Sequence, residues 1–285
     1  MSIIAGQTAL AEDFITESAG AGDEGKVPKL DAGGVLDKSF IYKDVQEFLI
    51  DGTWTKPTKG EFAIIEIWGA GASGGAISRG YDDGRCVGAG GGGGGEYVKV
   101  KAPLAGLGAT ETVVVGDGGV AVISTNSQSN GNNGGVSSFG SLISADGGKA
   151  GGYIVVDDNY TTFGGGAGGT GSTLETHQDG SVGGGGSVNS GSASASQGGS
   201  TPKSAGGGGG STYTTGSVAD AVGGTSYEGD SGGSGDAKFL ADATATGGDK
   251  ACGGGGAVCT KDGSGITNTA TSGKGGDGFV RVTTF

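Results

Sequence analysis

Hydrophobic and polar residues alternate over four segments of the chain, and this pattern predicts four β-strands. Residues 61–68 are rich in β-branched and aromatic side chains and end at Gly69. Residues 96–101 alternate valine with lysine, and residues 110–115 and 278–285 also have strand-like sequences. Because alternate side chains of a strand share a face, we expect one apolar interior that contains Ile65, Ile67, Val98, Val100, Val113, Val115, Val280 and Val282.

Weaker patterns extend this prediction to the rest of the chain. Residues 44–50, 120–123, 138–139, 142–143 and 153–156 indicate further strands. Helix signals are nearly absent, although residues 9–17 and 44–49 also fit a helix. The predicted fold is therefore mainly β: a small antiparallel β-sandwich with long glycine-rich insertions.

The predicted insertions are rich in glycine. Glycine makes up 72 of the 285 residues of the chain, about a quarter, against an average near 7%. Runs of glycine occupy residues 90–95, 164–166, 183–186, 206–210 and 253–256. Such composition is usual in flexible linkers. However, the runs recur between predicted strands of one domain, which favours packed polyglycine II helices. These are extended threefold helices without Cβ atoms, so their backbones can lie side by side and bond to one another.

Residues 1–45 differ in kind from residues 46–285. The N-terminal segment has few glycines, and residues 25–41 contain short extended pieces joined by Gly-Gly and proline turns. Its apolar residues are too few for an independent core. We expect it to be an attachment or connector segment that docks on a partner, followed by a glycine-rich β domain.

Charge and hydropathy restrict the partners. Lys+Arg 17 minus Asp+Glu 30 gives a net charge of −13, and no basic run is interleaved with aromatic residues. We therefore expect no nucleic-acid binding, which needs clustered cations. No stretch approaches the roughly 20 apolar residues of a membrane span, and the first residues lack the features of a signal peptide. A soluble protein without membrane insertion is expected.

The residues that commonly carry chemistry are few. Cys252 and Cys259 flank six small residues, so they are either free or joined in a disulfide, and a metal site would need further ligands. The single histidine, His177, lies in a polar stretch and is expected on an exposed loop. Residues 69–74 match a dinucleotide-binding pattern, but no helix signal follows. We expect no catalytic residue, no metal site and no cofactor.

An ordered series of motifs resembles the glycine-rich domain of phage tail-fibre and related virion proteins. The series comprises Gly52-Thr53-Trp54, Ile67-Trp68-Gly69-Ala70-Gly71, the run before Glu96-Tyr97-Val98, Gly134-Gly135-Val136 and Gly276-Asp277-Gly278-Phe279-Val280. The resemblance covers about residues 50–285, and residues 25–41 resemble phage attachment segments. It implies layered glycine helices whose connecting loops touch a host receptor, and it suggests association as a homotrimer.

These features predict a non-enzymatic virion fibre adhesin. Residues 1–45 would bind other virion proteins, and loops of tyrosine among small polar residues would contact a host surface glycan or protein. The candidate contact residues are Tyr81, Asp82, Asp83, Arg85, Asp157, Asp158, Asn159, Tyr160, Tyr213 and Tyr227. The alternatives are a capsid or virion decoration protein, a cellular surface protein and a glycan-degrading enzyme.

Overall fold

A computed structural model describes residues 43–80, 86–156, 161–163, 165–170, 177–189, 192–212, 218–226, 230–238, 241–261 and 268–285, with four N-terminal residue pairs. The described residues are mainly β-strand and extended chain, as predicted. A single helical turn, η5 (Leu104–Gly106), occurs among them. None of these residues forms a helix with the length and apolar character needed to cross a membrane.

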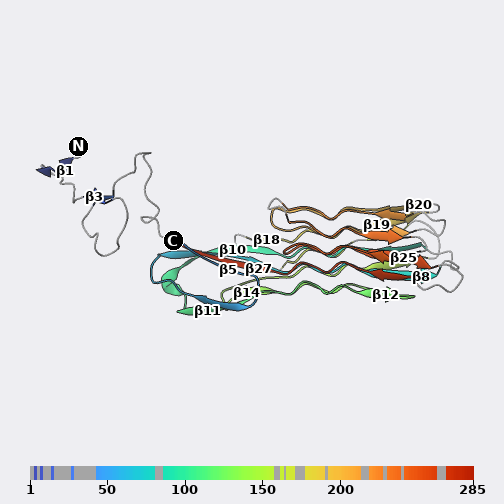
Figure 1. The fold of residues 1–285 in the computed structure, drawn as a ribbon, viewed down its shortest axis with the longest axis horizontal. Coiled ribbons are helices and arrows are strands. Elements are labelled where there is room, and N and C mark those ends of the chain that lie inside the picture. The colour runs from blue at the N-terminus through green and yellow to red at the C-terminus, as the bar shows by residue number, and fades with distance from the viewer. Residues whose placement is uncertain are drawn as a thin grey trace.

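A two-sheet antiparallel sandwich forms one end of the body (Figure 1). The five-stranded sheet has the order β18 (His177–Gln178), β10 (Tyr97–Pro103), β7 (Phe62–Trp68), β27 (Phe279–Thr284) and β5 (Asp44–Phe48). The four-stranded sheet has the order β15 (Ile143–Ala145), β14 (Ser137–Phe139), β11 (Thr110–Val114) and β6 (Gly52–Thr55). All neighbouring strands in both sheets are antiparallel, which confirms the predicted sandwich.

The sandwich encloses the predicted apolar interior. Seven of the eight residues named from the sequence are buried in one cluster, and Val100 packs against it partly buried. Trp54 and Phe139 fill the centre in an edge-on contact with ring centroids 5.4 Å apart. Trp54 is fully buried on β6, a strand that the sequence analysis did not assign.

The opposite end of the body, here called the distal end, contains four small sheets. Their orders are β12-β26-β24, β13-β8-β25-β23, β16-β9-β21-β22 and β17-β19-β20. Three pairs are parallel (β8 with β25, β23 with β25, and β24 with β26), which the sequence analysis did not anticipate. The strands are β8 (Ala76–Gly80), β9 (Cys86–Ala89), β12 (Ile123–Thr125), β13 (Gln128–Ser129), β16 (Tyr153–Val156), β17 (Thr161–Phe163), β19 (Gly186–Asn189), β20 (Ser192–Ala195), β21 (Gly210–Thr212), β22 (Val218–Asp220), β23 (Asp236–Lys238), β24 (Ala243–Thr244), β25 (Ala257–Lys261) and β26 (Thr269–Thr271).

Extended glycine-rich segments, here called glycine passes, join the two ends (Figure 1). They include residues 69–75, 90–96, 115–122, 130–136, 146–152, 165–170, 179–185, 205–209, 252–256 and 272–278. Of the described glycines, only Gly60 and Gly140 have positive φ, and both lie outside the passes. The chain therefore runs back and forth between the two ends of one body. The glycine-rich segments predicted as insertions form the middle of this body.

Backbone hydrogen bonds hold the glycine passes in a lattice with a three-residue period. In pass 90–96, the N–H groups of residues 90, 93 and 96 donate to pass 146–152, those of 91 and 94 to pass 179–185, and those of 92 and 95 to residues 254 and 251. The carbonyls of the same pass accept from passes 69–75, 165–170 and 205–209. Six neighbouring segments of the polypeptide thus surround pass 90–96, as expected for polyglycine II. The packed-helix prediction is confirmed and the linker alternative is wrong.

Two smaller predictions also have an outcome. The helix considered for residues 44–49 is wrong, because β5 pairs along β27 with Glu47 opposite Arg281. In the N-terminal segment, β1 (Ile3–Ile4) pairs with β2 (Gln7–Thr8), and β3 (Phe14–Ile15) pairs with β4 (Val27–Pro28). The helix considered for residues 9–17 is therefore wrong at Phe14 and Ile15. The domain boundary at residue 45 stays a prediction.

Candidate functional site

An aromatic cluster lies on the outer face of the five-stranded sheet, where the glycine passes begin. Trp68 lies 4.8 Å from Tyr97 and 5.2 Å from Phe279, measured between ring centroids. Two lysines lie over these rings: Lys250 Nζ is 4.4 Å from the Phe279 centroid, and Lys203 Nζ is 4.9 Å from that of Tyr97. Cation–π contacts of this kind cover the rings while keeping the ammonium groups near water. The cluster is separate from the sandwich core and forms a boundary between the outer face of the sheet and the glycine lattice.

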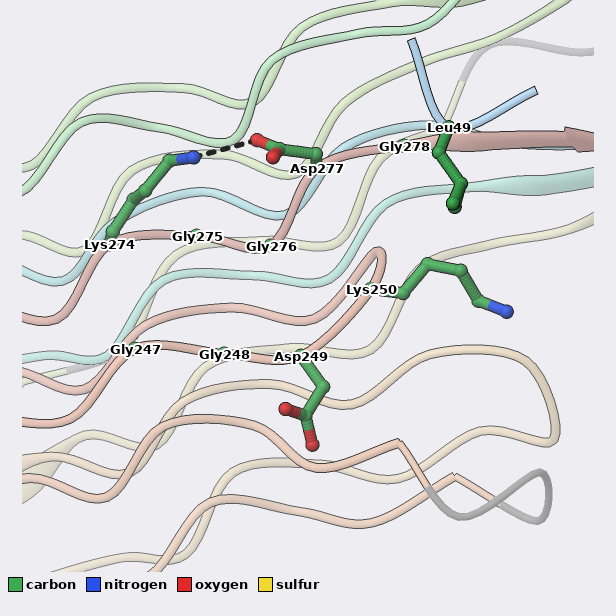
Figure 2. Close-up of a pocket in the computed structure, with 10 residues that line it drawn as sticks. All are labelled: Leu49, Gly247, Gly248, Asp249, Lys250, Lys274, Gly275, Gly276, Asp277 and Gly278. Atoms are coloured by element: carbon green, nitrogen blue, oxygen red, sulfur yellow. Dashed lines mark hydrogen bonds and ion pairs between the residues drawn. The ribbon is translucent and has the colours of Figure 1, made fainter.

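A groove of about 430 Å³ lies beside this boundary (Figure 2). Two glycine passes line it, at residues 247–250 and 274–278, together with Leu49 from the connection between β5 and β6. Leu49 and its neighbour Ile50 are 68% and 78% exposed, so they form an apolar projection at this end of the body. A second groove of about 320 Å³ shares Leu49 and Asp277 with the first.

The charged groups of the groove brace the lattice. Asp277 accepts hydrogen bonds from the Gly118 N–H and the Lys274 ammonium, both at 2.8 Å, and Asp249 accepts from the Ser231 N–H at 2.9 Å. Partial desolvation acts to raise the pKa of Asp277, but the hydrogen bonds from Lys274 and Gly118 outweigh it and hold that pKa below its ordinary value. Each carboxylate therefore accepts a hydrogen bond from the backbone of a neighbouring segment of the lattice. Among the described residues, no group of three or more His, Cys, Asp or Glu gathers to hold a metal.

All of the predicted contact residues lie outside the described residues. They belong to segments 81–85, 157–160, 213–217 and 227–229. The described residues that flank the first three segments lie together at the distal end. Cys86 pairs with Val156 across β9 and β16, and Val87 pairs with Thr212 across β9 and β21.

The fourth segment has its flanks at the other end of the body. Ser226 N–H donates to the carbonyl of Asp230 at 2.8 Å, and the Asp230 carboxylate lies 3.9 Å from Lys250 Nζ. Lys250 in turn covers Phe279 and Trp68 at the sandwich boundary. The candidate set therefore divides: the flanks of Tyr81, Asp157 and Tyr213 gather distally, and those of Tyr227 do not.

The glycine lattice keeps the two C-terminal cysteines apart. Cys252 lies at the sandwich end of pass 252–256 and Cys259 lies in distal strand β25, and both are free and buried. The disulfide alternative is therefore wrong. Burial raises the pKa of Cys252 to about 12, and it also raises that of Cys259. His177 lies in β18 and pairs with Val98, so the expectation of a loop is wrong, although its side chain is exposed at 36% beside Asp179.

Comparison with known families agrees with the glycine-rich composition of this body. A family model described as a glycine-rich domain matches residues 46–284. The chain belongs to this glycine-rich domain family. A search of the curated proteins found no match. The matched region extends from β5 through the glycine passes to β27, so the family corresponds to the whole body.

The groove and the residues whose hydrogen bonds hold its walls were not predicted from the sequence. Asp249 and Asp277 each follow a Gly-Gly pair near the sandwich end of a glycine pass. The repeated Gly-Gly-Asp sequence could have indicated these residues. A carboxylate at the end of a glycine pass can accept a hydrogen bond from a backbone N–H that has no carbonyl partner. Lys203 and Lys250 carried no comparable signal.

Proposed function

We propose that this chain is a non-enzymatic virion fibre adhesin whose distal end contacts a host-surface glycan or protein. The supporting observation is the meeting of described strand ends beside segments 81–85, 157–160 and 213–217. These segments combine tyrosines with aspartates, asparagine and arginine, a composition suited to adaptable polar recognition.

The lattice suits this role because its stability depends on backbone groups. Pass 90–96 is held on six sides by N–H and carbonyl groups, whatever residues connect the passes. Distal segments can then differ in sequence while the body keeps its shape. This separation of scaffold from contact residues favours a binding function over a catalytic one.

The sandwich end is proposed as the assembly end. The chain enters the body there at β5, directly after the N-terminal segment, and the exposed Leu49 and Ile50 project beside it. Residues 1–45 would join other virion proteins, which would place the protein on the particle. A homotrimer through this segment stays a prediction.

Binding to susceptible cells tests the proposal. Purified full-length protein should bind the cells and compete with particle adsorption. Replacing residues 81–85 and 157–160 by Gly/Ser should reduce binding while the thermal midpoint is unchanged. Replacing residues 227–229 is the matched control, because the flanks of this segment lie at the sandwich end.

Three results would count against the proposal. Unchanged binding after both distal replacements would remove the named contact residues. Loss of binding after replacement of residues 227–229 alone would move the contact to the sandwich end. Absence of cell binding, together with protein located across the capsid, would favour the decoration alternative.

A further inference from the structure

All sandwich strands except β5 and β6 are continuous with a glycine pass. β27, for example, follows pass 272–278, whereas β5 and β6 are joined directly through residues 49–51. β5 pairs with β27 and is followed by Leu49, so the groove of about 430 Å³ that Leu49 lines lies where a continuation of β5 would run. Within the described part of the chain, no glycine pass fills this position. We call it the Leu49 groove.

The N–H groups of pass 272–278 point in three directions, and one of these directions is open. Residues 272, 275 and 278 donate to pass 115–122, and residues 273 and 276 donate to pass 252–256. The N–H groups of Lys274 and Asp277 form the third set, and neither donates to an acceptor among the described residues. Both residues line the Leu49 groove, so an extended ligand would meet two donors there, about 9 Å apart.

Gly247 leaves room in the same groove. A Cβ added at this exposed residue would meet only Lys274, at 3.3 Å from its carbonyl oxygen and 3.9 Å from its nitrogen. At the next residue, Gly248, a Cβ would overlap the carbonyl group of Cys252, so lattice packing requires glycine there. Packing makes no such demand at Gly247. A side chain at this position would instead take up space in the groove, which glycine keeps free.

A charged pair forms the other wall of the groove. The side chains of Lys274 and Asp277 are both 52% exposed, and the Lys274 ammonium lies 2.8 Å from the Asp277 carboxylate. Figure 2 shows both side chains on the side of their pass that faces away from Gly247 and Gly248. Residues three apart share one face of a threefold helix. An extended segment with an acidic and a basic residue three positions apart can therefore place each beside the group of opposite charge.

We propose that the Leu49 groove binds an extended glycine-rich segment of a partner chain, in which an acidic and a basic residue are three positions apart. Two carbonyls of the segment accept hydrogen bonds from the Lys274 and Asp277 N–H groups. Glycine is needed where the segment faces the two passes, because a Cβ between neighbouring lattice segments meets backbone atoms, as it would at Gly276. The segment thus adds one more pass to the lattice.

This site gives a specific chemistry to the assembly role proposed for the sandwich end, on which it rests. The binding itself can be measured without particles or cells, so its failure would leave the distal contact untouched. Two backbone hydrogen bonds and two exposed ion pairs each contribute little. We therefore expect a dissociation constant of about 0.1–10 mM for one short segment. Several copies on one assembly would bind more tightly through avidity.

Peptide titration of the full-length protein tests the proposal. The probe is the peptide Gly-Gly-Asp-Gly-Gly-Lys-Gly-Gly, blocked at both ends. Its addition should shift the amide nuclear magnetic resonance signals of Lys274 and Asp277. The matched control peptide, Gly-Gly-Asp-Gly-Lys-Gly-Gly-Gly, has the same composition with the charges two positions apart. It should bind about threefold more weakly or less well still, because its charges point in different directions on a threefold helix.

Three variants locate the binding. Gly247→Leu should fill the groove and abolish the shifts, while its thermal midpoint stays close to that of the native chain. Gly152→Leu is the matched control, since a Cβ at Gly152 would meet only Asn130 Oδ1, at 3.7 Å, and binding should be retained. Lys274→Gln alters only an exposed charge, so it keeps the test valid if Gly247→Leu does not fold. It should remove the preference between the two peptides.

Four results would overturn the proposal. The first is the absence of any shift at Lys274 and Asp277 with about 30 mM peptide, which exceeds the expected dissociation constant. The second is equal binding of the two peptides by the native chain. The third is unchanged binding by folded Gly247→Leu protein. The fourth is an undiminished preference for the first peptide in Lys274→Gln.

Discussion

Substitution of Gly92 by alanine tests the glycine lattice directly. Gly92 lies in the central pass 90–96, where its N–H donates to the Gly254 carbonyl at 2.8 Å and its carbonyl accepts from the Gly207 N–H at 3.0 Å. A Cβ added at Gly92 would lie 2.1 Å from the carbonyl oxygen of Ala72 and 2.5 Å from its carbonyl carbon. Because ordinary contacts begin near 3.4 Å, either pass 90–96 or pass 69–75 must move by about 1 Å.

The expected cost follows from the bonds that this movement disturbs. Breaking two buried backbone hydrogen bonds costs about 1–3 kcal/mol each. Replacing glycine by alanine lowers the entropy of the unfolded chain, which offsets about 0.4–1 kcal/mol. The free energy of unfolding should therefore fall by about 1–6 kcal/mol, which corresponds to a thermal midpoint lower by roughly 2–20 °C.

Gly152 provides a matched control within the same lattice. Its carbonyl accepts from the Gly90 N–H at 2.9 Å, but a Cβ added there would meet only Asn130 Oδ1, at 3.7 Å. Gly152→Ala should therefore leave the stability unchanged or raise it by up to about 1 kcal/mol. Urea and thermal unfolding followed by circular dichroism would measure both variants. Equal stability of the two variants would refute the close-packed lattice.

Three further predictions concern single side chains. Ile67→Ala should lower the free energy of unfolding by about 2–4 kcal/mol, because Ile67 is fully buried in the small sandwich core; a loss below about 1 kcal/mol would contradict this. Because the raised pKa of Cys252 favours the thiol, stability present below pH 9 should be lost toward pH 12, and Cys252→Ala should reduce this loss but leave the part due to Cys259, whose pKa is also raised. Because the pKa of Asp277 is lowered, the destabilisation caused by Asp277→Asn should be largest above about pH 4 and should shrink in acid, as pH-dependent unfolding would show.

The sandwich could be predicted from the sequence because its strands bury large alternating side chains. β7, β10, β11 and β27 all agree with the predicted segments to within two residues at each end. β6 was missed because Trp54 is the only large apolar residue in a strand of glycine and threonine. Among the distal strands, β16 coincides with the predicted segment 153–156. Most of the others were missed for a related reason: β20 contains only serine and alanine, and β25 depends on neighbours distant in the sequence. Small side chains carry little periodic signal.

The lattice could be predicted only in outline. Glycine runs between strands indicate packed extended segments. The hydrogen-bond partners of each glycine, however, depend on how its pass is rotated about its own axis. Gly92 bonds to Gly254 and Gly93 bonds to Lys149, and nothing in the local sequence distinguishes these two glycines. The groove residues Lys274 and Asp249 are likewise brought together by chain paths distant in sequence. The candidate contact residues were chosen by composition, and those choices stay predictions.

The three-residue period of the lattice restricts how the length of a glycine pass can change. Within pass 90–96, residues 90, 93 and 96 all donate to the same neighbour, and residues 91 and 94 donate to another. Removing one residue would turn every later N–H by about a third of a turn, toward the wrong neighbour. Removing three would restore each pairing and shorten the pass by about 9 Å. Insertions and deletions in the passes should therefore survive selection mainly in multiples of three, while segments such as 81–85 remain free to change by any number.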